Sequence, residues 1–387
     1  MNIIAFTSIR SDYDLMSSLF TKLNDDNGID LTLIVGGAHN SQSFGYTAQD
    51  IEADGFNFIQ IESLIDGDND TSRIKSASIL MQSSIDLVKY LEPDLILYAG
   101  DREEVLVAGM IGGYLNIPTI HLFGGDHAED GHIDNPVRHA ASKLSTYHFV
   151  SAELHKKRLI SIGESEDRIF NIGSIALDKF IEVPIDTKIL SEVSARDVSK
   201  PGAILIFHPV EEERVIGSKI IEQTVNELIN YGYHVFIGKP NSDHGNVEIR
   251  NKLEELSIHD DVSFYGNLPR EKFIRLFKAC SLIIGNSSAG ILESPSIPVA
   301  SINIGKRQSS RLSADNVIFV NASIKEIRAA IAEVNSDEFR RNLKLTVNPY
   351  GDGQSVDKAY ELIKTLDFQR NLYKSEDPLK LEVQINE

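Results

Sequence analysis

The chain has only one cysteine, Cys280, in its 387 residues, so an internal disulfide bond is excluded. A chain without disulfides fits a reducing compartment, and we therefore expect a cytoplasmic protein. Cys280 stands at the start of an apolar run that ends at Ile284. This position is typical of a buried core thiol and not of a nucleophile.

Basic residues are also scarce: 38 lysines and arginines face 57 aspartates and glutamates, which gives a formal net charge of -19. Binding to nucleic acid or to an anionic membrane without specificity needs a basic surface, so this balance argues against both. It does not exclude a small anionic ligand, because a few arginines and helix N-termini can form a local positive site.

Long apolar runs and two common catalytic motifs are absent as well. No run of about eighteen apolar residues occurs, so no membrane-spanning helix is expected, and Met1–Phe6 predicts a first strand and not a signal peptide. The G-x-S-x-G motif is missing, which argues against a Ser-His-Asp hydrolase. The G-x-G-x-x-G motif does not follow the first strand, which argues against a nicotinamide enzyme.

Short apolar runs alternate with helical patterns along the chain, and this alternation is typical of α/β proteins with parallel sheets. The length allows two domains, and the alternation restarts at Pro201-Gly202 after the loosely patterned residues 183–200. We therefore predict an N-terminal domain at residues 1–172, a C-terminal domain at 173–365 and a tail at 366–387. Two doubly wound domains imply a central cleft between them, which is a preferred place for a ligand.

The same patterns predict the individual elements. Strands are expected in the first domain at residues 2–7, 31–36, 95–98, 119–123 and 148–150, and in the second at 203–207, 234–238, 262–265, 281–284, 299–304 and 317–320. Helices are expected at residues 12–24, 45–54, 71–92, 105–115, 135–144, 153–162 and 354–366.

Charged side chains gather in two strand-to-helix connections of the first domain, after residues 95–98 and after residues 119–123. These connections contain Asp101, Arg102, Asp126, Asp134 and Arg138. Ligands and catalytic groups in open α/β sheets lie beyond the carboxyl ends of the strands, so we predict an active site built from carboxylates. The alternative is a solvated acidic loop, since connecting segments are usually polar.

The second connection also holds residue types that bind metal ions, namely His127, Asp130, His132 and Asp134. However, no two histidines have the i, i+4 spacing of a zinc-binding helix, and no cysteine lies near. We therefore predict no metal and no other cofactor.

The second domain contains a candidate phosphate site, Ile284-Gly-Asn-Ser-Ser-Ala-Gly-Ile-Leu-Glu293, where small residues follow a strand and open a helix. Free N–H groups at a helix N-terminus attract phosphate, and Ser287 and Ser288 would add hydroxyl groups. Glu293 is placed to accept hydrogen bonds from a ribose. The alternative is an ordinary serine N-cap without a ligand.

Further polar residues follow strands in both domains: Arg10, His208, Asn241 and Arg307. Arginines in such positions can hold a diphosphate through charge-assisted, bidentate contacts. A surface charge, or for His208 a structural hydrogen bond, is the alternative.

Seven segments occur in an order that matches a known family. They are Gly100-Asp-Arg102, Gly124-Gly-Asp126, Ile133-Asp-Asn-Pro-Val-Arg-His139, Ser142-Lys-Leu144, Phe207-His-Pro-Val210, Gly285-Asn-Ser-Ser-Ala-Gly290 and Asn303-Ile-Gly-Lys-Arg-Gln308. The ordered set resembles the UDP-N-acetylglucosamine 2-epimerases over residues 2–365. It is most similar to the hydrolysing branch, which serves sialic acid and related nonulosonic acid biosynthesis.

The resemblance implies two Rossmann-like domains in a glycosyltransferase-B-like arrangement, with UDP held mainly by the second domain and the terminal helix crossing back onto the first. It implies conversion of UDP-N-acetylglucosamine to N-acetylmannosamine and UDP, by elimination to a 2-acetamidoglycal followed by hydration. The implied partners are the UDP-sugar, UDP and further copies of the chain, as a homodimer or homotetramer formed through helices of the first domain.

The resemblance also assigns site residues. Asp101, Asp126 and Asp134 match the catalytic acids of the family, and Arg138 matches a residue near the sugar. The positions that match nucleotide or sugar contacts are Arg10, Arg102, His208, Asn241, Ser287, Ser288, Glu293 and Arg307.

The chain departs from the family at one turn, where Phe123-Gly-Gly-Asp126 replaces the usual His-Gly-Gly-Glu. The shorter acid requires compensation by the loop, by His127 or by Glu129. Phe123 adds an apolar surface that would suit a deoxygenated sugar, so a second possible substrate is a UDP-2,4-diacetamido-2,4,6-trideoxyhexose of the legionaminic acid route. The same scaffold also suits a retaining glycosyltransferase, a non-hydrolysing epimerase or a nucleotide-sugar sensor.

Overall fold

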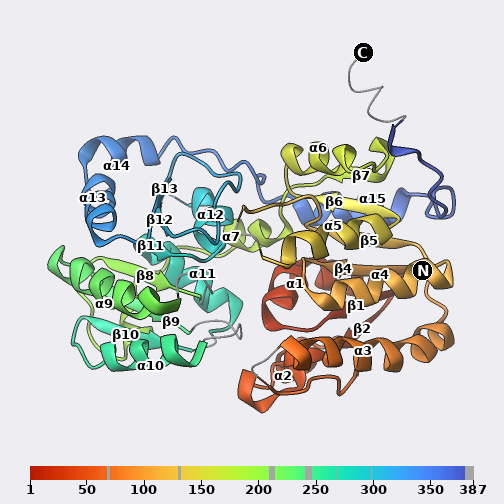
Figure 1. Ribbon diagram of the computed structural model, residues 1–387, viewed down its shortest axis with the longest axis horizontal. Coiled ribbons are helices and arrows are strands. Elements are labelled where there is room, and N and C mark those ends of the chain that lie inside the picture. The colour runs from red at the N-terminus through yellow and green to blue at the C-terminus, as the bar shows by residue number, and fades with distance from the viewer. Residues whose placement is uncertain are drawn as a thin grey trace. The chain divides into compact units, whose positions relative to one another are not determined.

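The computed structural model describes residues 1–67, 70–129, 132–208, 214–239, 246–266, 268–297 and 299–379, and its ribbon is drawn in Figure 1. The chain forms two compact units, each built on one parallel sheet. Unit 1 comprises Met1–His127, Gly131–Asp178 and Tyr350–Glu387, and unit 2 comprises Ala128–Asp130 and Lys179–Pro349.

The sheet of unit 1 has seven parallel strands, in the order β3 (Phe58–Gln60), β2 (Asp30–Val35), β1 (Asn2–Thr7), β4 (Leu95–Ala99), β5 (Thr119–Leu122), β6 (Tyr147–Val150) and β7 (Ile169–Asn171). Ile3 and Ala5 of β1 belong to one core cluster, whereas Ile4 and Phe6 belong to another. Successive side chains of a strand point to opposite faces, so both faces of this sheet are buried, as is usual for parallel sheets.

Helices cover the two faces of this sheet. They are α1 (Arg10–Asn24), α2 (Ala48–Ala53), α3 (Asp70–Leu91), α4 (Glu103–Leu115), α5 (Asp134–Leu144), α6 (Glu153–Ser161) and α15 (Ser355–Thr365). Figure 1 shows α3, α4 and α5 side by side, and α15 packs against α1. Among the helices of the described ranges, none is long and apolar enough to cross a membrane.

The sheet of unit 2 has six parallel strands, in the order β10 (Val262–Tyr265), β9 (His234–Gly238), β8 (Gly202–Ile206), β11 (Cys280–Gly285), β12 (Ala300–Ile304) and β13 (Val317–Val320). Its helices are α8 (Ile189–Ser194), α9 (Arg214–Asn230), α10 (Asn246–Leu256), α11 (Arg270–Ala279), α12 (Ala289–Leu292), α13 (Ile324–Val334) and α14 (Asp337–Leu343), while α7 (Asp178–Glu182) stands where the chain leaves unit 1. Cys280 is buried, as predicted, and burial raises the pKa of its thiol.

The predicted α/β class with parallel sheets is confirmed, but two strands were missed. These are β3 and β7, the three-residue strands at the edges of the first sheet. The units also differ from the predicted ranges, because the chain leaves unit 1 after Asp178 and not after residue 172. Residues 350–365, which the prediction assigned to the second domain, lie in unit 1 because α15 buries Val356, Ala359 and Ile363 in its core, so the terminal helix does cross back.

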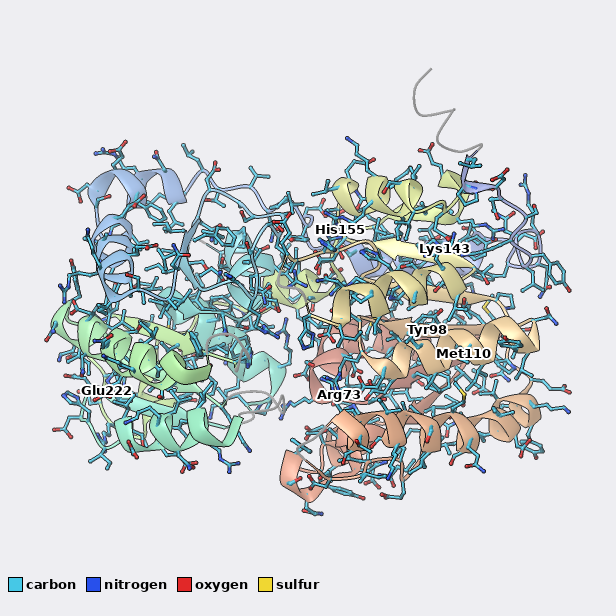
Figure 2. The ribbon with its side chains drawn as sticks, in the orientation of Figure 1. Arg73, Tyr98, Met110, Lys143, His155 and Glu222 are labelled. Atoms are coloured by element: carbon cyan, nitrogen blue, oxygen red, sulfur yellow. The ribbon has the colours of Figure 1, made fainter. Side chains whose placement is uncertain are left out.

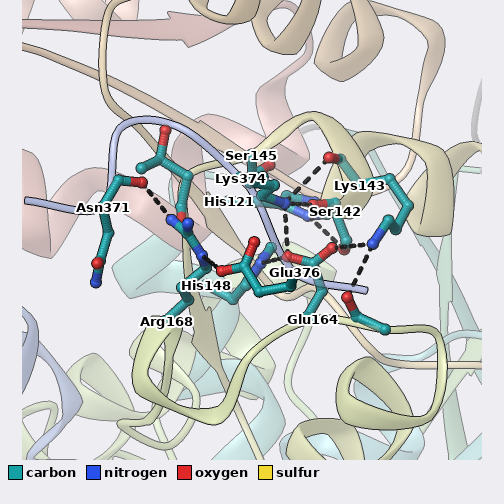
Figure 3. Close-up of polar contacts among 12 residues, drawn as sticks. His121, Ser142, Lys143, Ser145, His148, Glu164, Arg168, Asn371, Lys374 and Glu376 are labelled. Carbon is teal, nitrogen blue, oxygen red and sulfur yellow. Dashed lines mark hydrogen bonds and ion pairs between the residues drawn. The ribbon is translucent and has the colours of Figure 1, made fainter. Parts of the chain in front are cut away.

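A buried group of charges lies beside β6, around the carboxylate of Glu164, which is 1% exposed (Figure 3). We call Glu164, His148, Lys143 and Lys374 the Glu164 cluster. Lys143 Nζ lies 2.6 Å from Glu164 Oε1, and His148 Nε2 and Lys374 Nζ lie 2.8 Å and 2.5 Å from Glu164 Oε2. Burial alone would raise the pKa of Glu164, but the hydrogen bonds and charges of these three partners lower it to about 2.

The same cluster fixes the segment that follows α15. Lys374 Nζ donates to the carbonyl oxygens of Ser142 and Lys143 at the C-terminal end of α5, at 3.2 Å and 3.0 Å. Arg168 pairs with Glu376 and donates to the carbonyl oxygen of Tyr373 at 3.0 Å. Cations near the last carbonyl groups of a helix satisfy acceptors that the helix itself leaves open. Residues 367–379 therefore hold the C-terminal end of α5 in place.

Replacing Glu164 by Gln should destabilise unit 1, because the buried His148 and the half-buried ammonium group of Lys374 would lose their anion. We expect the free energy of unfolding at pH 7 to fall by about 3 kcal/mol, as when one partner of a buried ion pair is removed. The pKa of Glu164 is lowered from 4.5 to about 2, so this stabilisation is complete above pH 4.5 and is lost as the pH falls towards 2. Urea unfolding at pH 7 and at pH 3 measures both effects.

The matched control is Glu166→Gln, since Glu166 pairs with Lys156 at 2.8 Å but is 72% exposed. An exposed pair contributes at most about 1 kcal/mol, so this variant should unfold almost like the parent chain. Equal losses for the two variants would contradict a stabilising role of the buried cluster.

Candidate active site

The carboxyl ends of β4 and β5 are joined through His121, whose ring is completely buried. His121 Nε2 lies 2.8 Å from the carbonyl oxygen of Gly100, and Nδ1 lies 3.0 Å from Ser142 Oγ on α5. Burial lowers the pKa of His121 to about 3, so the ring is neutral near pH 7. Because a carbonyl only accepts, Nε2 carries the hydrogen, and the hydroxyl of Ser142 donates to Nδ1. One neutral ring thus connects two strand ends and a helix.

Arg138 of α5 brings two of the predicted catalytic acids together. Its buried guanidinium pairs with the carboxylate of Asp101, just beyond β4, and donates to the backbone carbonyl of Asp126 at 3.0 Å. Burial alone would lower the pKa of Arg138, but the carboxylates of Asp101, Asp126 and Asp134 outweigh it and raise the pKa. Residues of the two connections therefore meet at Arg138.

Asp134, the third predicted acid, is the first residue of α5 and is 32% exposed. Its Oδ2 lies 3.1 Å from His132 Nδ1, while its Oδ1 is buried and has no hydrogen-bond partner within the described ranges. A buried carboxylate oxygen without a donor is uncommon in folded proteins. Asp134 can therefore accept a hydrogen bond or a proton from a ligand.

The glycine pair before Asp126 permits a close approach between its turn and α6. Gly125 has φ +78°, and a Cβ atom there would lie 2.4 Å from the carbonyl oxygen of His155. Arg158, one turn further along α6, donates to the carbonyl oxygen of Gly125. As a result His155 Nε2 lies 3.4 Å from Asp126 Oδ1. The sequence patterns gave no sign of His155, which lies in an ordinary helical pattern and is labelled in Figure 2.

The start of α4, next to Arg102, carries a second residue that the sequence patterns missed, Glu104. Arg102 Nε lies 3.6 Å from Glu104 Oε2, and Arg102 Nη2 lies 3.8 Å from Glu103 Oε1. Glu103 also pairs with Arg73 of α3 at 2.6 Å, and Figure 2 labels Arg73. Burial raises the pKa of Glu104 to about 7, although the charge of Arg102 opposes this shift. Glu104 can therefore exchange a proton near neutral pH.

Two histidines of the stretch 127–139 stack on each other. The rings of His127 and His139 lie 5.6 Å apart at 19°. Burial, assisted by the charge of Arg138, lowers the pKa of His139 to about 4. Within the described part of the chain, no three His, Cys, Asp or Glu side chains are placed to hold a metal ion, and Asp130 lies outside that part.

In unit 2, the side chain of Asn286 organises the predicted phosphate site. Its amide accepts from the backbone N–H of His208 at 2.7 Å and donates to the carbonyl oxygen of His208 at 2.9 Å. The carbonyl oxygen of Asn286 accepts from Arg307 at 3.0 Å and from Gln308 at 3.2 Å. Residues beyond β8, β11 and β12 therefore meet at Asn286, through its side-chain amide and its backbone carbonyl, which brings His208 and Arg307 beside the serine pair.

The serines and Glu293 lie at the two ends of α12. Ser288 is its N-cap, and Ser287 Oγ accepts from the backbone N–H of Ala289 at 3.4 Å. However, α12 has only four residues, so a helix dipole adds less here than the sequence pattern suggested. Glu293 is buried and pairs with Arg270 through Oε1, while Oε2 has no hydrogen-bond partner among the described residues. That oxygen is available to a hydroxyl donor.

Two further residues were predicted to contact the nucleotide or sugar, Arg10 and Asn241. Arg10 opens α1 and pairs with Asp14 at 3.3 Å and Asp50 at 3.8 Å. Asn241 lies outside the described residues. Within unit 1 the structure thus unites Asp101, Asp126 and Arg138 with Asp134 on the same helix, and within unit 2 it unites His208, Arg307 and the serine pair.

Comparison with known proteins gives a consistent result. A family model described as UDP-N-acetylglucosamine 2-epimerase matches residues 21–364. The UDP-N,N'-diacetylbacillosamine 2-epimerase (hydrolyzing) of Legionella pneumophila is 34% identical over 373 residues, which cover 94% of this chain and 96% of that protein. The GDP/UDP-N,N'-diacetylbacillosamine 2-epimerase (hydrolyzing) of Campylobacter jejuni is 32% identical over 340 residues, which cover 87% and 88%.

A solved structure supports the fold independently. The crystal structure of UDP-GlcNAc 2-epimerase from Neisseria meningitidis, bound to UDP-GlcNAc, matches with a TM-score of 0.80 and 18% identity. The match covers 95% of this chain and 100% of that one, so both units share its fold.

The close approach at Gly125 can be tested by substitution. Gly125→Ala should lower the free energy of unfolding by about 3 kcal/mol, because the methyl group adds a clash with the backbone of α6 to the strain of a left-handed residue. Gly55→Ala is the matched control, since Gly55 has φ +80° but nothing within 4 Å of its Cβ position. It should lose only about 1 kcal/mol from backbone strain. Equal losses in urea unfolding would show that the contact with His155 is not tight.

Proposed function

This chain belongs to the UDP-N-acetylglucosamine 2-epimerase family, and from that premise we propose that it is a hydrolysing 2-epimerase of a UDP-linked 2-acetamido sugar. The observation that carries the proposal is the buried guanidinium of Arg138, which holds Asp101 and the turn of Asp126 beside Asp134. A reaction that moves protons to and from carbon needs several positioned carboxyl groups, and this arrangement supplies three of them.

The proposed reaction has two balanced steps. In the first, a carboxylate removes the proton from C2 while the C1–O bond breaks, so UDP departs and a 2-acetamidoglycal remains. In the second, the oxygen of water bonds to C1 and water gives one proton to a carboxylate, while a carboxyl group gives a proton to C2 on the opposite face. The products are UDP and the free sugar with inverted C2. Asp101, Asp126 and Asp134 are the proposed acids and bases, and Arg138 is proposed to hold Asp101 and Asp126 near the sugar.

The departing diphosphate gains negative charge as the C1–O bond breaks, so fixed donors and cations near it assist departure. We assign this role to His208, Arg307 and the hydroxyls of Ser287 and Ser288, which surround Asn286. Glu293 Oε2 is proposed to accept from a ribose hydroxyl, with Arg270 holding the other oxygen. Arg10, Arg102 and Asn241 remain proposed contacts to the nucleotide or sugar.

For the sugar, we favour a 2,4-diacetamido-2,4,6-trideoxyhexose over N-acetylglucosamine. Both related proteins above 30% identity are named as diacetylbacillosamine 2-epimerases, which supports this choice. Phe123 stands in the turn of Asp126, where it is half-buried with φ +63° and packs against the core of unit 1. An apolar ring there suits a methyl group better than a hydroxyl. N-acetylglucosamine stays the second candidate because the family model bears its name.

Proton NMR in D₂O tests the proposal directly. We expect the purified protein to release UDP and the free 2-epimer with deuterium at C2 from UDP-2,4-diacetamido-2,4,6-trideoxyglucose, and to act more slowly on UDP-N-acetylglucosamine. A pocket that fits one methyl group discriminates by about 10- to 200-fold, which sets the expected ratio of kcat/KM. A UDP-sugar epimerised without release of UDP would indicate a non-hydrolysing enzyme. If neither sugar reacts, the protein is better explained as a transferase or a sensor.

Asp134→Asn separates chemistry from binding. The substitution keeps the size of the side chain but removes its ability to exchange a proton, so turnover should fall by at least about 100-fold. Calorimetric binding of UDP should stay unchanged, and so should the melting temperature, because Asp134 is partly exposed. Unchanged turnover would remove Asp134 from the mechanism.

We also propose that the protein is a homo-oligomer formed through α3 and α4, which lie side by side. These helices expose Ile74, Tyr90, Met110 and Tyr114, of which Met110 and Tyr114 share one face at i, i+4 (Figure 2 labels Met110). Light scattering should give a dimer or tetramer mass, and Tyr114→Glu should lower it towards the monomer. A monomeric parent chain would contradict this interface.

A further inference from the structure

His155 is a buried histidine that none of the predicted roles uses. It lies in the first turn of α6, its side chain is 2% exposed, and Figure 2 shows its place in the fold. On one side its Nε2 lies 3.4 Å from Asp126 Oδ1. On the other side its ring packs against the ring of the fully buried Tyr350, with centroids 5.7 Å apart.

Neither ring nitrogen of His155 makes a hydrogen bond that meets the usual geometry within the described residues. The Nε2 atom lies 3.4 Å from Asp126 Oδ1, and this contact is not a hydrogen bond in the structure. A buried polar group without a hydrogen bond costs about 1–3 kcal/mol, so such a residue is retained for a reason other than stability. Hydrogen bonds of catalytic groups are often long or misaligned in the free enzyme and tighten with substrate.

We propose that His155 is a positioning residue for Asp126, donating from Nε2 to Oδ1 when the sugar is bound. The proposal rests on the hydrolysing epimerase activity proposed above. The Nε2–H tautomer leaves only an acceptor at Nδ1, so the ring needs no second donor site. With the backbone N–H of His127 at 2.8 Å, Oδ1 would then receive two hydrogen bonds. Two donors on one oxygen fix the carboxylate plane and favour its ionised form.

This role explains how the chain accommodates Asp126, which is one methylene shorter than the glutamate its family usually has there. Other groups of the expected substitutes, Glu129 and His127, make contacts elsewhere. The backbone N–H of Glu129 instead donates to the carbonyl oxygen of Ser309 at 3.0 Å, and the ring of His127 faces His139. The compensation comes from α6, because Gly125 lets the turn lie directly on the backbone of His155.

Other charges also act on Asp126, and they set the background against which His155 works. Arg138 of α5 and Arg158 of α6 both interact with its carboxylate electrostatically, as does His139. On the far side of His155 the facing titratable group is Tyr350. Both arginines stay charged over the working pH range, so their effect is constant there, and removal of His155 changes only the local donor.

Two variants of His155 test the proposal through the pH profile of kcat/KM. His155→Ala removes the donor, so kcat should fall by about 10- to 100-fold, as expected for a misplaced catalytic group. KM should change little, and the acidic limb should move to higher pH, because the pKa of Asp126 rises when a donor to its ionised form is lost. His155→Gln places an amide N–H near the position of Nε2, so it should recover most of kcat and return the acidic limb.

Leu154→Ala is the matched control, since Leu154 is the neighbouring residue on α6 and is 41% exposed. It should leave kcat, KM and the pH profile unchanged. The positioning role is refuted if His155→Ala folds and its acidic limb stays at the pH of the parent chain. It is also refuted if His155→Gln restores neither kcat nor the acidic limb. If the His155→Ala variant does not fold, the His155→Gln variant decides alone. A folded Gln variant whose acidic limb does not lie at the pH of the parent chain overturns the proposal.

The failure of this inference differs from the failure of the proposed function. A parent chain that releases UDP, combined with His155 variants of unchanged profile, refutes only the role of His155. A parent chain that releases UDP from neither sugar refutes the proposed function first, and the role of His155 with it.

Discussion

The buried guanidinium of Arg138 is the constraint on which the candidate active site depends. A guanidinium cannot lose its proton in a protein, so burying it requires carboxylates and carbonyl groups placed around it. Arg138 meets this requirement through the carboxylate of Asp101 and the backbone of Asp126, which belong to two different strand ends. The carboxylate of Asp101 balances the cation, and the turns that carry Asp101 and Asp126 must stay in place to satisfy it. One buried charge therefore specifies the position of the groups around it.

The helix α5, which carries Arg138, is held by two sets of contacts in its last turn. Ser142 hydrogen-bonds to the buried ring of His121, which fixes the helix against β5. At its C-terminal end, Lys374 binds the last carbonyl groups and joins them to Glu164. With 11 residues the helix is about 16 Å long, so the contacts of Lys374 act at a distance from Asp134. A segment more than 200 residues away in sequence thus supports the helix that carries two predicted site residues.

Sequence patterns predicted the central strands well because a strand buried on both faces is a continuous apolar run, as β1 and β8 are. The three-residue edge strands β3 and β7 lack such a run and were missed. Asp101 and Asp126 could be predicted to lie close together, because they follow adjacent parallel strands and such strands end at the same edge of the sheet. The same rule could not find His155, because that contact arises from the close approach at Gly125 and not from any local pattern. Asn286 was part of a predicted motif, but its role depends on His208 and Arg307. These residues follow β8 and β12, and only the fold brings them to Asn286.

The two units organise their residues with different chemistry, and the difference suits the work proposed for each. In unit 1 the organiser is a charged residue, Arg138, because the groups it holds are carboxylates whose ionisation matters for proton transfer. In unit 2 the organiser is Asn286, whose neutral side-chain amide binds the backbone of His208 and whose backbone carbonyl accepts from the guanidinium of Arg307. A carboxylate in that position would repel the anionic diphosphate of a substrate in a chain that already carries a net charge of -19. A neutral organiser adds no such repulsion, so the local cations and hydroxyls remain effective for an anion.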